Sequence, residues 1–148
     1  TPAEEVFSLL GPSLKVWENV SGEEASCQIR IPGNSYYLEI ELEAPSDFDL
    51  TLAEEGEFSL RLVCSGGKTA LSSTAPQVRD VRFPSAAENV THIQVFFDRR
   101  VAEVFLNHGE DAGTKLFYCS RTDGKLAVSF PPGARIRSFR LSRLLSIY

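Results

Sequence analysis

Apolar and polar residues alternate along much of this chain with a period of two. The clearest example is 36–42, where apolar side chains occupy the even positions and Tyr37, Glu39 and Glu41 occupy the odd ones. This alternation is typical of a β-strand that buries one face and leaves the other face polar. Similar stretches, separated by Gly, Pro, Asn and Asp, occur at 27–31, 48–52, 58–64, 126–130 and 136–147.

Many short strands at regular spacing predict an all-β domain, either a sandwich of two antiparallel sheets or a barrel. The chain shows no strand–helix–strand alternation and no internal repeat. Only residues 1–11 suggest a helix, because Thr1, Pro2 and Glu4 stand in the order typical of a helix start. Gly11-Pro12 would then end that helix.

The strongest strand signal is a hairpin over residues 92–114. Two apolar runs, at 93–97 and 101–106, flank the polar Asp98-Arg99-Arg100. Branched and aromatic residues bounded by Asp, Asn and Gly are the usual signal of a β-hairpin. Such a pattern reports packing first, so we expect the hairpin to contribute to the core, with Phe105 buried in it.

The same hairpin resembles the FVDRSSVEVFVNDGE…T signature in the C-terminal β-sandwich of glycoside hydrolase family 32. That family contains invertases, levanases, inulinases and sucrose-6-phosphate hydrolases. We expect the matching signature residues to be structural, and they are Asp98, Arg99, Glu103, Phe105, Asn107, Gly109 and Thr114. The chain departs from the family pattern at Arg100, Val101, His108 and Cys119. Looser similarity extends to both ends of the chain.

The resemblance implies a concanavalin-like sandwich of two antiparallel sheets over residues 13–148. Residues 1–12 would be a helical or linker segment that leaves an N-terminal five-bladed propeller. The family's two catalytic carboxylates lie in that propeller, in segments such as WMNDPN, RDP and EC. None of these segments occurs here, so we expect no catalytic residue in this chain.

The resemblance therefore implies a non-catalytic C-terminal module of a β-fructosidase, which needs no cofactor and buttresses the propeller. The parent enzyme would hydrolyse terminal β-fructofuranosyl bonds in sucrose or fructans, with the fructoside at the cleft between the domains. A homo-oligomer is a further possible assembly. Two other interpretations stay open, an independent carbohydrate-binding module and an oligomerisation module.

These interpretations predict different surfaces. A carbohydrate-binding module needs an exposed aromatic ring, and Tyr37 is the candidate because it shares a polar, acidic face with Glu39 and Glu41. A buttress instead needs an apolar patch that its partner domain covers. The segment from Val6 to Leu10 is the candidate for part of that patch.

Composition narrows the choice of partner. The chain has 148 residues and a net charge of −5, which argues against nucleic acid or an anionic membrane as a partner. No apolar run approaches the roughly 20 residues that span a membrane. The chain begins at Thr1 and contains no Met, which predicts a processed chain or a piece of a longer protein. Cytoplasmic and secreted locations both stay open.

Other residues with reactive side chains point to structure more than to chemistry. Asp98 and Glu103 are close enough in sequence to form a carboxylate pair, but an acid in a turn usually binds nearby backbone. His92 and His108 have no Cys or acid at metal-ligand spacing, so we expect no metal site. The three cysteines are expected to be buried free thiols, and they are Cys27, Cys64 and Cys119.

Overall fold

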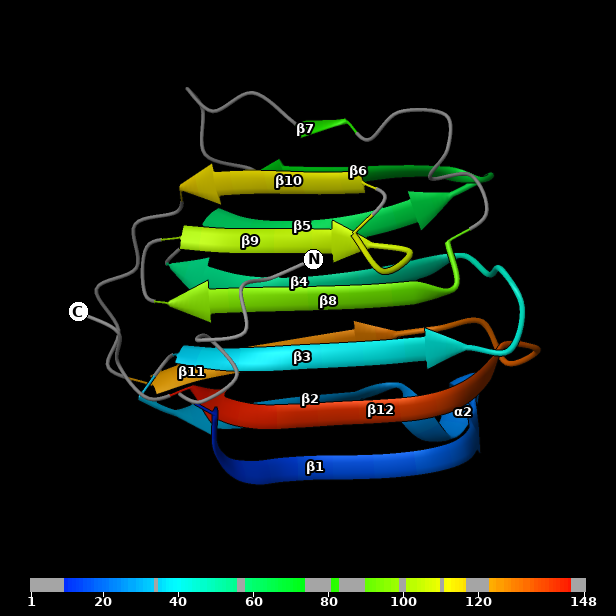
Figure 1. Cartoon of the computed structure of the whole chain (residues 1–148), viewed down its shortest axis with the longest axis horizontal. Helices are drawn as coiled ribbons and strands as arrows, with labels where there is room; N and C mark the ends of the chain where they lie inside the picture. The colour runs from blue at the N-terminus through cyan, green and yellow to red at the C-terminus, as the bar shows by residue number, and fades with distance from the viewer. Residues whose placement is uncertain are drawn as a thin grey trace.

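Two antiparallel sheets of six strands each make up most of the described chain, and they lie face to face (Figure 1). The structure is a computed structural model that describes residues 10–33, 35–55, 58–73, 81–82, 90–98, 101–109, 111–116 and 123–144. The predicted sandwich of two antiparallel sheets is confirmed, and the barrel is excluded. Within the described residues, no helix is long and apolar enough to span a membrane.

The two sheets have simple strand orders. The front sheet of Figure 1 runs β1 (Leu10–Ser21), β12 (Arg135–Leu144), β3 (Ser35–Leu42), β8 (His92–Asp98), β9 (Val101–Leu106) and β10 (Asp111–Leu116). The rear sheet runs β2 (Cys27–Pro32), β11 (Asp123–Ser129), β4 (Phe48–Glu55), β5 (Phe58–Ser65), β6 (Lys68–Ser73) and β7 (Val81–Arg82). We call the front sheet sheet A and the rear sheet sheet B.

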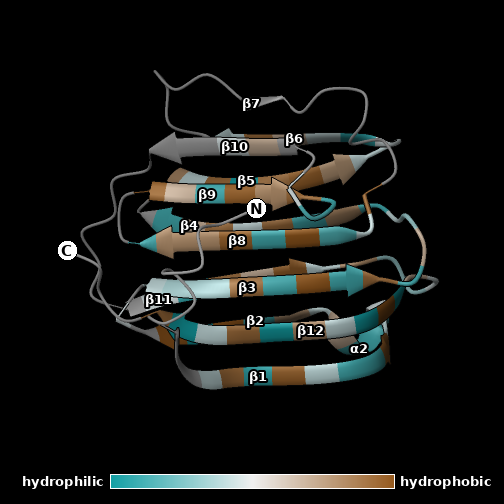
Figure 2. Cartoon of the chain, viewed as in Figure 1, coloured by the Kyte–Doolittle hydropathy of each residue, from teal (hydrophilic) through white to brown (hydrophobic). Residues whose placement is uncertain are grey.

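The core lies between the sheets, where the alternating apolar side chains of both inner faces meet. Figure 2 shows the alternation of hydrophobic and hydrophilic residues along β3 and β12. Leu38 and Ile40 of β3 are fully buried opposite Leu141 and Phe139 of β12. The hydroxyl of Tyr36 crosses the core and donates a 2.8 Å hydrogen bond to the carbonyl oxygen of Leu52 in β4. The predicted period of two therefore identifies the inner face of β3 correctly.

One strand departs from this alternation. All residues of β8 from 92 to 97 are buried, on its outward face as well as its inward face. A strand of an antiparallel sandwich usually leaves one face in water. The outward side chains of β8 therefore form a second, smaller buried layer on the outside of sheet A.

The single helix among the described residues is α2 (Gly22–Ala25), which connects β1 to β2. Ser21 caps it, because the Ser21 hydroxyl accepts a 3.2 Å hydrogen bond from the backbone N–H of Glu24 and the Glu24 carboxylate reaches back to Ser21. Hydrophobic periodicity cannot reveal a four-residue helix, although the Ser-Gly-Glu-Glu capping sequence signals it. Residues 1–9 of the predicted helix at 1–11 lie outside the described residues, whereas Leu10 and Gly11 belong to strand β1 and not to a helix. The domain boundary near residue 12 stays a prediction.

Candidate functional site

The signature residues lie in the β8–β9 hairpin, in the turn after it and in β10, where Thr114 lies opposite Glu103 of β9. Asp98 fixes the end of the hairpin to a third strand. Asp98 lies opposite Ser35 of β3, and the Ser35 hydroxyl donates a 2.5 Å hydrogen bond to the Asp98 carboxylate. Ser35 is 7% exposed. Asp98 therefore ties β3 to the hairpin. The neighbouring Arg99 and Arg100 lie outside the described residues.

The side chains of β9 that face the core are not the ones that we predicted. Ala102, Val104 and Leu106 are fully buried and point inward, so Phe105 lies on the outward face. Phe105 is only partly buried and meets Phe96 edge-on, with ring centroids 6.2 Å apart. The prediction that Phe105 is buried in the sandwich core is therefore wrong. Its immediate neighbours are both buried core residues, and successive side chains of a strand point to opposite faces.

Asn107 and Gly109 form the turn that follows β9. Asn107, His108 and Gly109 have φ angles of 51°, 58° and 90°, a left-handed conformation that Asn and Gly adopt most readily. The Asn107 side-chain oxygen accepts hydrogen bonds from the backbone N–H groups of Thr91 (2.9 Å) and His92 (3.4 Å). Asn107 therefore joins this turn to the start of β8.

A buried histidine lies beneath this turn. His92 is 2% exposed, its Nε2 lies 2.8 Å from an oxygen of Glu39, and its Nδ1 accepts a 3.2 Å hydrogen bond from the backbone N–H of His108. The neutral ring therefore carries its proton on Nε2 and donates it to Glu39. This hydrogen bond is the main reason that the pKa of Glu39 is lowered.

The ring of His108 covers one face of the His92 ring. It stacks on the His92 ring with centroids 3.8 Å apart and an interplanar angle of 11°. The described residues contain no group of three or more His, Cys, Asp or Glu side chains placed to hold a metal ion. Sequence reasoning missed the Glu39–His92 contact because it depends on the pairing of β3 with β8.

Tyr37 is not the exposed ring that we predicted. It is 4% exposed, its ring lies 4.6 Å from that of Phe96, and its hydroxyl accepts a 2.9 Å hydrogen bond from the Gln94 side chain. Burial raises the pKa of Tyr37 to about 12. A ring packed in this way offers no open face for a sugar to stack on. Tyr37 therefore belongs to the outer buried layer of sheet A.

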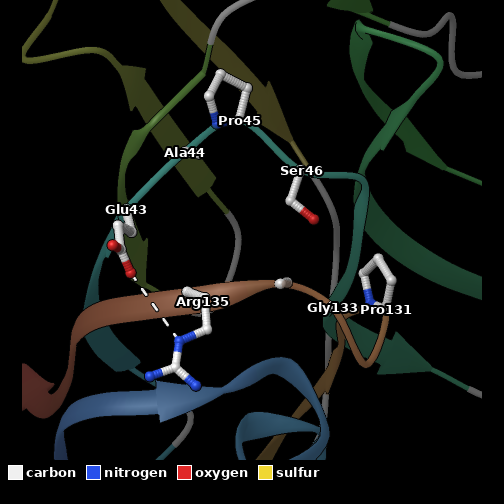
Figure 3. Close-up of a pocket in the computed structure, with 8 residues that line it drawn as sticks. Glu43, Ala44, Pro45, Ser46, Pro131, Gly133 and Arg135 are labelled. Atoms are coloured by element: carbon white, nitrogen blue, oxygen red, sulfur yellow. Dashed lines mark ion pairs between the residues drawn. The ribbon is translucent and has the colours of Figure 1, made fainter.

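A hollow of about 610 Å³ lies at one end of the sandwich, between the β3–β4 and β11–β12 connections (Figure 3). Its lining residues are Glu43, Ala44, Pro45, Ser46, Pro131, Gly133, Ala134 and Arg135. Glu43 and Arg135 both line it and form an ion pair, with the Glu43 carboxylate 4.0 Å from Arg135 Nε. Both side chains are 61% exposed. Sequence patterns do not predict this hollow because its two walls are far apart in the chain.

The thiols are only partly as predicted. Cys64 is buried and free, as expected, and Cys27 is free but only partly buried. Burial raises the pKa of the Cys27 thiol, and Lys15 opposes this effect. Cys119 lies outside the described residues.

The predicted apolar patch falls largely outside the described residues, since Val6 to Leu9 are not described. Among the described side chains, the large hydrophobic ones that are exposed are Val16 (50%) and Phe58 (39%). Val16 belongs to β1 in sheet A and Phe58 to β5 in sheet B. They form no joint patch, so the surface that would meet a partner domain stays a prediction.

Comparison with known proteins identifies the family. A family model described as "Glycosyl hydrolases family 32 C terminal" matches residues 5–142. Among solved structures, a glycoside hydrolase family 32 protein from Bifidobacterium adolescentis is 30% identical, with a TM-score of 0.80 over 99% of this chain and 23% of that chain. A sucrose-6-phosphate hydrolase from Lactobacillus gasseri is 18% identical, with a TM-score of 0.68 over 99% of this chain and 31% of that chain.

A galectin from Caenorhabditis elegans shares the fold alone, at 14% identity and a TM-score of 0.57, over 86% of this chain and 96% of that one. A comparison with curated proteins found no match. This chain spans less than a third of each of the two hydrolases. The family match over residues 5–142 covers nearly the whole chain, which therefore belongs to glycoside hydrolase family 32 as a C-terminal domain of that family.

Proposed function

We propose that this chain is the non-catalytic C-terminal module of a β-fructosidase and that it buttresses an N-terminal five-bladed propeller. The observation that carries the proposal is the family match over residues 5–142, together with coverage of only 23% and 31% of the two hydrolases. The whole protein would hydrolyse terminal β-fructofuranosyl bonds of sucrose or fructans. Its nucleophile and acid would lie in the propeller.

The positions of the signature acids support a structural role for them. A retaining glycosidase places two carboxyl groups on either side of the scissile bond, about 5–5.5 Å apart. Asp98 instead accepts a hydrogen bond from the largely buried Ser35, and Glu103 is exposed on the outward face of β9. Neither acid lines the hollow at the end of the sandwich.

Ion pairs on the outward face of sheet A support the proposed buttressing role. Two ion pairs connect β12 to the C-terminal end of β3, Arg137 to Glu41 at 3.4 Å and Arg135 to Glu43 at 4.0 Å. Exposed pairs contribute little free energy each, about 0–1 kcal/mol, but they help to fix the strand register. A fixed register suits a module that holds another domain in position.

An activity assay on two proteins tests the proposal. The gene upstream of Thr1 should encode Asn-Asp-Pro and Glu-Cys segments, and the resulting longer protein should release fructose from sucrose or inulin. The 148-residue chain alone should release none, because it lacks these segments. Fructose release by the chain alone, lost on Asp98→Asn or Glu103→Gln, would contradict the proposal.

A further inference from the structure

We infer that the hollow between the β3–β4 and β11–β12 connections is a binding site for a fructan segment. The inference rests on the proposed function, because that function supplies the class of sugar. It also replaces Tyr37, whose ring is buried, as the candidate for sugar binding by this domain. Figure 3 shows Glu43 and Pro45 on the β3–β4 side of the hollow and Arg135 and Pro131 on the β11–β12 side.

Backbone hydrogen bonds hold both walls of the hollow in place. The N–H of Glu43 donates to the carbonyl oxygen of Arg135 at 3.0 Å and so joins the two walls directly. The N–H of Ala134 donates to the carbonyl oxygen of Pro131 at 3.0 Å. The N–H of Gly22 donates to the carbonyl oxygen of Ala134 at 2.8 Å. A ligand therefore meets a preformed site and avoids the cost of ordering loops.

The charges of the lining favour a neutral ligand. The lining contains one acid, Glu43, and one base, Arg135, so its formal charge is −1 + 1 = 0. Glu43 already neutralises the charge of Arg135 that a phosphate would need, and Arg135 neutralises the charge of Glu43 that a cation would need. At 4.0 Å and 61% exposure, both groups still have free hydrogen-bonding capacity toward solvent. Adjacent sugar hydroxyls can donate to the carboxylate and accept from the guanidinium.

The remaining lining groups fit a non-planar sugar better than a flat aromatic ligand. They offer the C–H surfaces of Pro45, Pro131 and Ala44 and no aromatic ring. A volume of about 610 Å³ lies within the range of small-molecule sites. A smaller hollow of about 230 Å³ shares Pro45 and Ser46 of the β3–β4 connection with the first. A chain-like ligand could contact both hollows across this connection.

Titration of the 148-residue chain with nystose, a short fructooligosaccharide, tests the site by calorimetry or by amide chemical shifts. Gly133→Leu is the blocking variant, because a Cβ at Gly133 meets no heavy atom within 4 Å and its φ lies outside the left-handed range. Gly133 lines the hollow and a Cβ there enters open space, so a leucine adds bulk at the lining without straining the fold. We expect saturable binding by the parent chain and at least about a tenfold loss of affinity in Gly133→Leu.

Arg137→Ala is the matched control. It removes the neighbouring exposed ion pair with Glu41, which lies outside the hollow, so nystose affinity should not change. Arg135→Ala should weaken binding. Thermal unfolding of all variants establishes that they are folded.

Three outcomes would overturn the inference: no saturable binding by the parent chain, equal binding by Gly133→Leu, or equal binding of maltotetraose, a glucose oligomer. None of them affects the fructose-release assay of the longer protein. If instead the longer protein releases no fructose while nystose binds in the hollow, the proposed function fails and the binding site stands.

Discussion

The backbone at Gly22 leaves no room for a side chain. Its N–H binds the carbonyl oxygen of Ala134, and a Cβ at this position would lie 2.1 Å from the carbonyl oxygen of Pro131. No side-chain rotation relieves that contact, because the opposing atom belongs to the backbone. Gly22 is thus required by close approach of two chain segments, although it begins a helix, where Gly is otherwise unfavourable.

We therefore expect Gly22→Ala to lower the free energy of unfolding by about 1–3 kcal/mol, as overpacked sites do. Urea denaturation followed by circular dichroism measures this change. Gly133→Ala is the matched control, since a Cβ there meets nothing and the stability should stay close to that of the parent. Equal denaturation midpoints for the two variants would contradict the close contact at Gly22.

Glu39 gives the fold a dependence on acid pH. Its pKa is lowered from 4.5 in the folded chain, chiefly by the hydrogen bond from His92. A group whose folded pKa is lowered stabilises the fold above its unfolded pKa and loses that contribution as the pH falls through the folded pKa. The parent chain should therefore exceed Glu39→Gln in stability at pH 7, and the difference should shrink as the pH falls below 4.5. Denaturation at a series of pH values measures it, and a constant difference would count against this role.

The β9–β10 turn shows how one element depends on the start of another. The side chain of Asn107 binds two backbone N–H groups of residues 91 and 92, and its backbone takes the left-handed conformation. Asn107→Ala removes the acceptor of two partly buried N–H groups and should cost about 1–3 kcal/mol of stability, the usual cost of leaving a buried donor unsatisfied. Asn107→Asp keeps an oxygen in place and should lose less. Thermal unfolding that ranks the two variants equally would argue against the role of the side-chain oxygen.

A second prediction at this scale compares a core phenylalanine of β12 with the outward phenylalanine of β9. Phe139 of β12 is fully buried and packs against Trp17 at 4.9 Å, whereas Phe105 lies on the outward face and is only partly buried. Phe139→Ala should cost about 3–5 kcal/mol, as large truncations in cores do. Phe105→Ala should cost clearly less, because water already reaches part of the ring. Equal losses in equilibrium denaturation would show that the outer layer of sheet A matters as much as the core.

Sequence patterns predicted strands best where apolar and polar residues alternate without interruption. In β3 the four even residues from Tyr36 to Leu42 are all buried, as the pattern predicted. In β9, five of six residues are apolar, so the pattern could not distinguish the inward face from the outward one. The prediction that Tyr37 is exposed was wrong for another reason. Its burial depends on contacts with Phe96 and Gln94 of β8, and a pattern within one strand does not reveal its neighbour.

For the molecule as a whole, the signature in one hairpin predicted both the family and the two-sheet fold, because those residues determine a turn and a strand pairing. The hollow could not be predicted in the same way. It forms only where the β3–β4 connection meets the β11–β12 connection, and its geometry follows from the strand order of both sheets. The match with a family C-terminal domain and the coverage of only part of longer hydrolases are the basis of the proposed non-catalytic role.

The order in which the strands are synthesised differs from the order in which they lie in sheet A. Among the described strands, β1 pairs with β12 alone, and β12 lies between β1 and β3. The nascent β1 therefore has no native partner until residues 135–144 emerge, after every other strand of the described chain. Until then its backbone is available to other unfinished chains, which favours misassembly during translation. Closing such a distant contact last is also slow. Emergence of β12 thus supplies the native partner that the nascent β1 lacks among the described strands.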